Sequence, residues 1–262
     1  MAPGRVYDFT WQSETIAALA DGGLWWPARR LLAIADLHLG RSGRLARTRG
    51  LLLPPWETPE TIERLTVLID ALDPATVVCL GDSFDDDAAA RELRKEDRTA
   101  LLEMATGRRW IWVAGNHDPA CPATARSSGE RQEPTGDINA GDRPWTARLD
   151  RFVSGSIVFR HIASAEAKVT GGEISGHFHP KHRLSSRGVR ITRPCFLVSD
   201  RRIILPAFGH YTGGLDCCEP PFPDLIGPRA IAILTGTKAL PVPVRCPGAR
   251  IGRNPRSGRG GS

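Results

Sequence analysis

The chain has 262 residues, of which 41% are hydrophobic and 24% charged, a composition that suits a soluble globular protein with one large core or at most two small ones. No apolar run is long enough to cross a bilayer, and residues 1–10 lack the apolar segment of a secretory signal, so we expect a cytoplasmic protein with no membrane contact. The net charge of +6 would suit a nucleic-acid partner, but residues 245–262 contain five arginines and no acid, and subtracting those five charges leaves +1.

Residues 1–244 are predicted to form one folded domain, followed by a disordered Arg- and Gly-rich tail over residues 245–262. Such a tail either holds nucleic acid loosely or only aids solubility. The six cysteines include no C-x-x-C pair, and we expect no disulfide framework in a chain of this size without a secretion signal. We interpret the adjacent Cys217 and Cys218 as a coincidence of sequence and not as a zinc site.

The first half of the chain alternates strand and helix patterns. Residues 5–29 are predicted as a leading β segment, and an Arg-rich loop is predicted over Arg41–Gly50. Thr58 has the features of a helix N-cap, with Pro59 at the first helical position. Buried strands are predicted over 31–35, 76–80 and 109–113, with helices over about 58–73 and 88–104. This order predicts a largely parallel sheet with crossover helices.

The second half of the chain is dominated by short apolar runs. Residues 119–148 are polar and rich in Pro, Gly, Ser and Arg, and we interpret them as a mobile insertion beside the site. Strands are then predicted over residues 156–159, 173–175, 195–198, 203–205 and 230–234. They indicate a second sheet layer.

Polar clusters follow the apolar runs at five places. They are Asp36-x-His38, Gly81-Asp82-x-x-Asp85, Gly115-Asn116-His117-Asp118, the single His161, and Gly176-His177-x-His179. In open parallel sheets, ligands bind beyond the carboxyl ends of the strands. Nitrogen and oxygen donors without thiolates suit Mn, Fe or Zn. The set is too large for one tetrahedral ion, whereas two ions bridged by a shared carboxylate would use all of it.

Four of these clusters, all except the single His161, are motifs. In this order they resemble those of the calcineurin-like metallophosphoesterases, and the resemblance covers Trp26 to Gly214. It implies an α/β fold (an α+β sandwich) with a two-sheet core flanked by helices, and two divalent metal ions, with Mn favoured over Fe or Zn. Matched residue by residue, it implies that Asp36, His38 and His179 hold the first ion, Asp82 bridges both, and Asn116, His161 and His177 hold the second.

The resemblance also implies a mechanism. Two cations lower the pKa of a bridging water, so that hydroxide is available near neutral pH, and they neutralise the phosphate oxygens. His117 would face the phosphate and stabilise the transition state or protonate the leaving oxygen, while Asp118 orients its ring. No covalent enzyme intermediate is required.

Further motifs resemble a bacterial branch of this family, the ligase-associated DNA-damage-response endonucleases. The residues that carry this resemblance are Trp26-Pro27, Ala35–Gly40, Gly50–Pro55, Arg193–Phe196, Leu205–Gly209 and Thr212–Gly214. They imply Mn-dependent cleavage of DNA phosphodiesters, beside an ATP-dependent DNA ligase, a helicase and an exonuclease. Two residues depart from the pattern, because Asp85 stands where a His is usual and His210 where an apolar residue is usual.

Other interpretations are kept for several residues and for the function. Arg41 and Arg44, with Arg47 and Arg49, would either contact the phosphate backbone or form a solvated basic loop. His161 would be a ligand or a satisfied core residue, while Lys181 and His182 are expected at the surface. The enzyme would alternatively hydrolyse small phosphoesters or nucleotide and lipid pyrophosphates, and a metal-binding scaffold without activity is the third hypothesis. A nuclease needs an open basic groove, whereas a small-molecule enzyme usually has a closed pocket.

Overall fold

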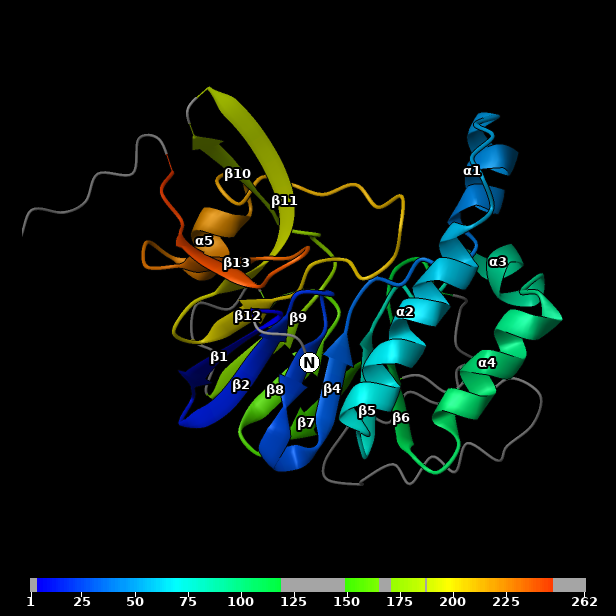
Figure 1. The fold of residues 1–262 in the computed structure, drawn as a ribbon, viewed down its shortest axis with the longest axis horizontal. Helices are drawn as coiled ribbons and strands as arrows, with labels where there is room; N and C mark the ends of the chain where they lie inside the picture. Colours follow the sequence, from blue (N-terminus) through cyan, green and yellow to red (C-terminus); the bar gives the residue numbers. More distant parts are fainter. Residues whose placement is uncertain (1–3, 119–148, 165–170, 187, 247–262) are drawn as a thin grey trace, which may run out of the picture.

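The computed structural model describes residues 4–118, 149–164, 171–186 and 188–246. The predicted insertion at 119–148 and nearly all of the predicted tail lie outside these ranges. Two β-sheets pack face to face, and helices α2 (Glu57–Leu72) and α4 (Lys95–Ala105) lie on the outer side of the first sheet (Figure 1). The predicted sandwich with a two-sheet core flanked by helices is confirmed.

The first sheet has six strands in sequence order. They are β1 (Val6–Trp11), β2 (Glu14–Leu19), β3 (Leu24–Trp26), β4 (Leu31–Ile34), β5 (Thr76–Leu80) and β6 (Arg109–Val113). Strands β1 to β4 pair antiparallel, with the 3-10 turn η1 (Pro27–Arg29) before β4, whereas β4, β5 and β6 are parallel. Crossover helices make this parallel pairing possible, as the alternation of strand and helix patterns predicted.

The second sheet has eight strands. Its order is β14 (Leu240–Pro243), β13 (Ile231–Leu234), β11 (Val189–Val198), β12 (Arg202–Ile204), β9 (Gly172–Ser175), β8 (Ile157–Arg160) and β7 (Arg151–Ser154), with β10 (Lys181–Ser186) paired to β11. The five strands predicted in this half are all present. Strands β7, β10 and β14 were not predicted, because polar residues or prolines make up at least half of each. Helix α5 (Phe222–Ile226) covers the outer face of this sheet.

Three predictions about the helices are wrong in detail. The segment predicted as an Arg-rich loop is helix α1 (Arg41–Arg49), which buries one apolar side chain, Leu45, and therefore shows no apolar periodicity. Helix α2 begins at Glu57, and Thr58 is not its N-cap, because the Thr58 hydroxyl accepts a hydrogen bond from the Gly40 N–H at 2.8 Å. The single helix predicted over 88–104 is two helices, α3 (Asp87–Arg91) and α4.

The cysteines differ from the sequence prediction. Cys218 and Cys246 form a disulfide that joins the loop before α5 to the residues after β14. Sequence spacing gave no sign of it, because the two lie 28 residues apart. Cys217 and His182 are buried, with His182 Nδ1 2.8 Å from Cys217 Sγ, so His182 is not the surface residue that was expected. Among the described residues, no helix is long and apolar enough to cross a membrane.

Candidate metal centre

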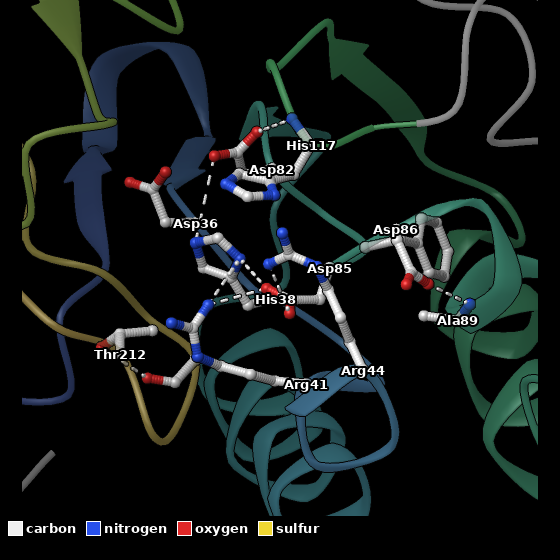
Figure 2. Close-up of polar contacts among 12 residues, drawn as sticks. Asp36, His38, Arg41, Arg44, Asp82, Asp85, Asp86, Ala89, His117 and Thr212 are labelled. Carbon is white, nitrogen blue, oxygen red and sulfur yellow. Dashed lines mark hydrogen bonds and ion pairs between the residues drawn. The ribbon is translucent and has the colours of Figure 1, made fainter. Parts of the chain in front are cut away.

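The predicted ligands lie in the loops that follow five strands of the two sheets. Asp36, Asp82 and Asn116 follow β4, β5 and β6, whose carboxyl ends form one edge of the first sheet. His161 follows β8, and His177 and His179 follow β9 of the second sheet. The centre therefore lies where the ends of both sheets meet. Figure 2 shows the part of it that surrounds His38.

The first group of donors consists of Asp36, His38 and His179, whose ligand atoms all lie within 4.8 Å of one another. His179 Nε2 is 3.4 Å from both His38 Nε2 and Asp36 Oδ1. Asp36 and His38 are buried, and His179 is partly exposed. These are the three residues that the sequence assigned to the first ion.

The second group consists of Asp82, His161 and His177, again with ligand atoms within 4.8 Å of one another. His161 Nε2 is 3.1 Å from His177 Nδ1, 3.4 Å from Asp82 Oδ2 and 3.0 Å from the side-chain oxygen of Asn116. Asp82 Oδ2 is also 4.0 Å from His38 Nε2 of the first group. The Asp82 carboxylate thus lies between the two groups, and its bridging of two ions stays a prediction.

The donor set fits divalent ions. Asp36 Oδ1 is buried and has no hydrogen-bond partner among the described residues, which is costly unless another group compensates it. His161 Nδ1 contacts the Leu80 carbonyl at 2.8 Å, and His38 Nδ1 contacts the Asp85 carboxylate at 2.6 Å. An imidazole held in this way by one nitrogen presents the other to a metal. Both rings present Nε2 to their group.

The backbone at these positions is unusual. In the described part of the chain ten non-glycine residues have positive φ, and five of them are predicted ligands: Asp36, His38, Asp82, His177 and His179. Such conformations are costly and concentrate at functional sites. Strand β4 ends at Ile34, so the alternation of side chains along a strand does not bring Asp36 and His38 together. They converge through left-handed turns beyond the strand.

Two glycines of the motifs leave room for the ligands. A Cβ at Gly115 would lie 2.1 Å from the Asp82 nitrogen, and a Cβ at Gly81 would lie 2.4 Å from the His161 ring. Both distances are far below any normal contact. The glycines therefore permit the close approach of loops after three different strands.

Asp85 contacts the ring nitrogen of His38 that faces away from the first group of donors. It is fully buried, and its carboxylate contacts His38 Nδ1 at 2.6 Å, the Arg41 guanidinium at 2.7 Å and the Arg44 guanidinium at 3.3 Å (Figure 2). Burial would raise the pKa of Asp85, but the hydrogen bond with His38 and the two arginine charges outweigh it and lower the pKa to about 2. Sequence reasoning left the role of Asp85 open, and no pattern linked it to a histidine 47 residues away.

The charges of the second group are coupled. Burial disfavours the charged form of both Asp82 and His161, but their mutual hydrogen bond and attraction outweigh it. The pKa of Asp82 is consequently lowered, and that of His161 is raised to about 9. The pKa of His177 is lowered, by burial first and then by repulsion from His161.

His117 and Asp118 occupy different positions in the loop after β6. The His117 ring packs edge-on against His38, with ring centroids 5.4 Å apart, and the backbone N–H of His117 donates to Asp82 Oδ1 at 2.8 Å (Figure 2). The ring is partly exposed beside the donor groups. Asp118 accepts hydrogen bonds from the backbone N–H groups of Ser83, Phe84 and Gly115. These bonds tie the loops after β5 and β6 together, while ring orientation by Asp118 stays a prediction.

The remaining polar residues lie at the rim of the centre or outside it. Arg41 and Arg44 both contact Asp85, which in turn contacts His38 of the first group. Phosphate contact by either arginine stays a prediction. Arg47 forms an ion pair with Asp86 at 2.8 Å. His210 contacts Arg64 at 3.2 Å and Glu60 at 3.7 Å, and burial followed by the Arg64 charge lowers its pKa.

Comparison with known proteins identifies the family. The family described as calcineurin-like phosphoesterase matches residues 29–192, which is more than half of the chain. The crystal structure of Pseudomonas putida nuclease MPE is similar, with 25% sequence identity, a TM-score of 0.63, and coverage of 90% of this chain and 100% of that chain. Comparison with curated proteins gave no match. The predicted family is confirmed, and this chain belongs to the calcineurin-like phosphoesterases.

Proposed function

We propose that the protein is a dinuclear-metal phosphodiesterase that cleaves DNA. The observation that carries the proposal is the pair of adjacent donor groups with the Asp82 carboxylate between them. Membership of the phosphoesterase family and similarity to a nuclease support hydrolysis of a phosphoester in nucleic acid. DNA repair, and action beside an ATP-dependent DNA ligase, a helicase and an exonuclease, are proposed from sequence resemblance alone.

Each group has a role in holding the metals. Asp36, His38 and His179 would hold one ion, Asn116, His161 and His177 the other, and Asp82 both. Two divalent ions bound there, with Mn expected, would activate water and neutralise the phosphate oxygens. The hydrogen bonds to His38 and His161 fix these rings before the metal arrives. This preorganisation spares the site the cost of ordering them during the reaction.

His117 is the proposed catalytic acid. Its ring is partly exposed beside both groups, and its backbone N–H is bonded to Asp82. A phosphodiester held at the centre would therefore lie within reach of the imidazole. The protonated ring would donate to the leaving oxygen as the phosphorus–oxygen bond breaks, or stabilise the charge of the transition state.

The proposal is tested with purified protein and three substrates: bis-p-nitrophenyl phosphate, p-nitrophenyl phosphate and single-stranded DNA. With Mn we expect hydrolysis of the diester and of DNA, loss of activity with a chelator, and recovery when Mn is returned. Asp82→Ala should reduce both activities to background, and His117→Ala should lower them by about 100- to 10,000-fold. Asp224→Ala, at an exposed carboxylate of α5, is the matched control.

The alternatives give different results in the same assay. Hydrolysis of the monoester without the diester or DNA would favour a small-molecule phosphoesterase. Diester and DNA cleavage that persists in Asp82→Ala would overturn the assigned centre. A folded protein that binds Mn and hydrolyses nothing would favour the scaffold hypothesis.

A further inference from the structure

Large apolar side chains lie exposed in two segments that contact each other, and one of these segments also contacts Arg41 at the rim of the candidate metal centre. Leu51 is 48% exposed, Leu52 85% and Trp56 69%, all in the segment between α1 and α2, and Tyr211 is 41% exposed in the turn after β12. We call these four residues the apolar patch. Single exposed apolar residues are ordinary, but several gathered at one place indicate a binding surface.

Two hydrogen bonds hold the parts of the patch together and connect it to the centre. The Tyr211 hydroxyl donates to the Pro54 carbonyl at 3.2 Å, which joins the turn to the segment carrying the leucines and Trp56. The Tyr211 carbonyl accepts from Arg41 Nε at 2.9 Å, and the other end of the same guanidinium contacts Asp85, the partner of His38. Tyr211 also has a positive φ of 55°, a costly conformation for a bulky residue.

Positive charge adjoins the patch. Helix α1 ends at Arg49, two residues before Leu51, and contains four arginines and no acidic residue. Arg41 and Arg44 share Asp85, and Arg47 pairs with Asp86 and Glu92. Arg49 is exposed and has no ion pair or side-chain hydrogen bond within the described part of the chain. An exposed cation that no described residue pairs with, at the edge of the apolar patch, suits a ligand that has both phosphates and apolar rings.

We propose that the apolar patch is a stacking platform for unpaired bases of the DNA strand whose phosphodiester lies at the metal centre, an inference that rests on the proposed function. Exposed aromatic rings combined with arginines are the means by which proteins hold single strands without reading their sequence. The bases of a duplex are stacked on each other and have no free face to offer. The platform would therefore favour single-stranded segments over duplex DNA.

The test compares variants on substrates with and without unpaired bases. Trp56→Ala removes the most exposed ring, Trp56→Phe keeps a ring, and Val67→Ala changes a 61% exposed apolar residue further along α2. Each protein is assayed with Mn on a single-stranded oligonucleotide, the same oligonucleotide with abasic positions flanking the cleavage site, its full duplex, and bis-p-nitrophenyl phosphate. The readout is kcat/KM for each DNA divided by kcat/KM for the small diester, which corrects for any change at the metal centre.

For the single strand we expect this ratio to fall by at least about fivefold in Trp56→Ala, to recover in Trp56→Phe, and to stay at the wild-type value in Val67→Ala. For the abasic strand and for the duplex, the ratio should be the same in Trp56→Ala as in the wild type, because neither DNA offers a base to the platform. An equal loss on every DNA, or none on the single strand, would overturn the inference while leaving the proposed function intact. Wild-type protein that cleaves neither DNA nor the small diester would overturn the proposed function itself.

Discussion

The His38 ring shows how much of the centre depends on a residue that binds no metal. An imidazole has two nitrogens, and it serves as a ligand only if the correct one faces the ion. Asp85 holds Nδ1 at 2.6 Å and is itself held by Arg41 and Arg44. The orientation of Nε2 is therefore set by a network of opposite charges around the buried Asp85 carboxylate.

Asp85→Asn should weaken metal binding. The amide is nearly the same size but carries no charge, so both the orientation of His38 and the basicity of its ring are reduced. We expect the Kd for Mn to rise about 10- to 100-fold, measured by calorimetry and by titrating activity with Mn. Asp87→Asn, at an exposed carboxylate two residues away, is the control and should bind Mn as the wild type does. An Asp85→Asn protein with unchanged Mn affinity would show that the contact is only structural.

At this scale the sequence predicted which side chains gather but not how they are held. Asp36, Asp82 and His177 were recognisable because each follows an apolar run in a motif with a fixed order. The role of Asp85 was not predictable, because it depends on a contact between the loops after β4 and β5. The left-handed backbone at five of the predicted ligands could not be foreseen either, since only the packing of the surrounding loops makes such conformations tolerable.

Helices α1 and α3 are elements that local sequence pattern described poorly. Helix α1 has a single buried apolar side chain, Leu45, and is held in place by polar contacts. The Ser42 N–H and hydroxyl both donate to the buried Glu57 carboxylate, at 3.0 and 2.7 Å, which fixes the start of α1 against the start of α2. Apolar periodicity predicts helices that bury a stripe, as α2 does, and it misses helices held in this way.

Asp86 caps α3, and its removal should destabilise the protein in a pH-dependent manner. Its carboxylate accepts from the Ala89 N–H at 2.7 Å (Figure 2), and it pairs with Arg47. Burial would raise its pKa, but these two contacts outweigh burial and lower it. Asp86→Ala should therefore lower the free energy of unfolding by about 1 kcal/mol at neutral pH.

The pH dependence of that difference follows from the lowered pKa. A carboxylate whose pKa is lower in the folded state stabilises the fold above its unfolded pKa of about 3.9. The stabilisation is lost as pH falls through the folded value, so wild type and Asp86→Ala should converge in acid. Urea unfolding of both proteins at several pH values measures the difference between their free energies of unfolding. Asp86→Asn keeps a capping side chain without charge, so it should lose less stability than Asp86→Ala. A stability difference between wild type and Asp86→Ala that grows in acid would contradict this role of Asp86.

At the scale of the whole molecule, the two layers of the sandwich were predictable, whereas the way they meet was not. Short apolar runs in the second half indicated another sheet. Nothing local indicated that β12 would lie between β9 and β11, parallel to the first and antiparallel to the second. That arrangement puts the loop after β9, with His177 and His179, at the end of the first sheet. The family motifs, and not periodicity, predicted this meeting of loops.

The distribution of charge over the molecule makes the last residues a candidate DNA contact. Three of the four arginines of α1 are already paired with acids, so they add little net positive charge. Residues 245–262 contain no acid, and four of their arginines lie after Cys246: Arg250, Arg253, Arg256 and Arg259. Removing these four lowers the net charge from +6 to +2. Non-specific affinity for DNA depends on such charges and weakens with salt.

A chain ending at Cys246 keeps the disulfide to Cys218 and lacks these four arginines. We expect it to bind a single-stranded oligonucleotide less tightly, with a slope of log K against log salt that is shallower by about 0.7 for each lost phosphate contact. Fluorescence anisotropy over a range of NaCl concentrations gives both quantities. A full-length chain with the four arginines changed to glutamine should match the truncated one, because charge and not length is responsible. Identical slopes for wild type and both variants would show that the tail only aids solubility, and would leave DNA binding to α1 and the apolar patch.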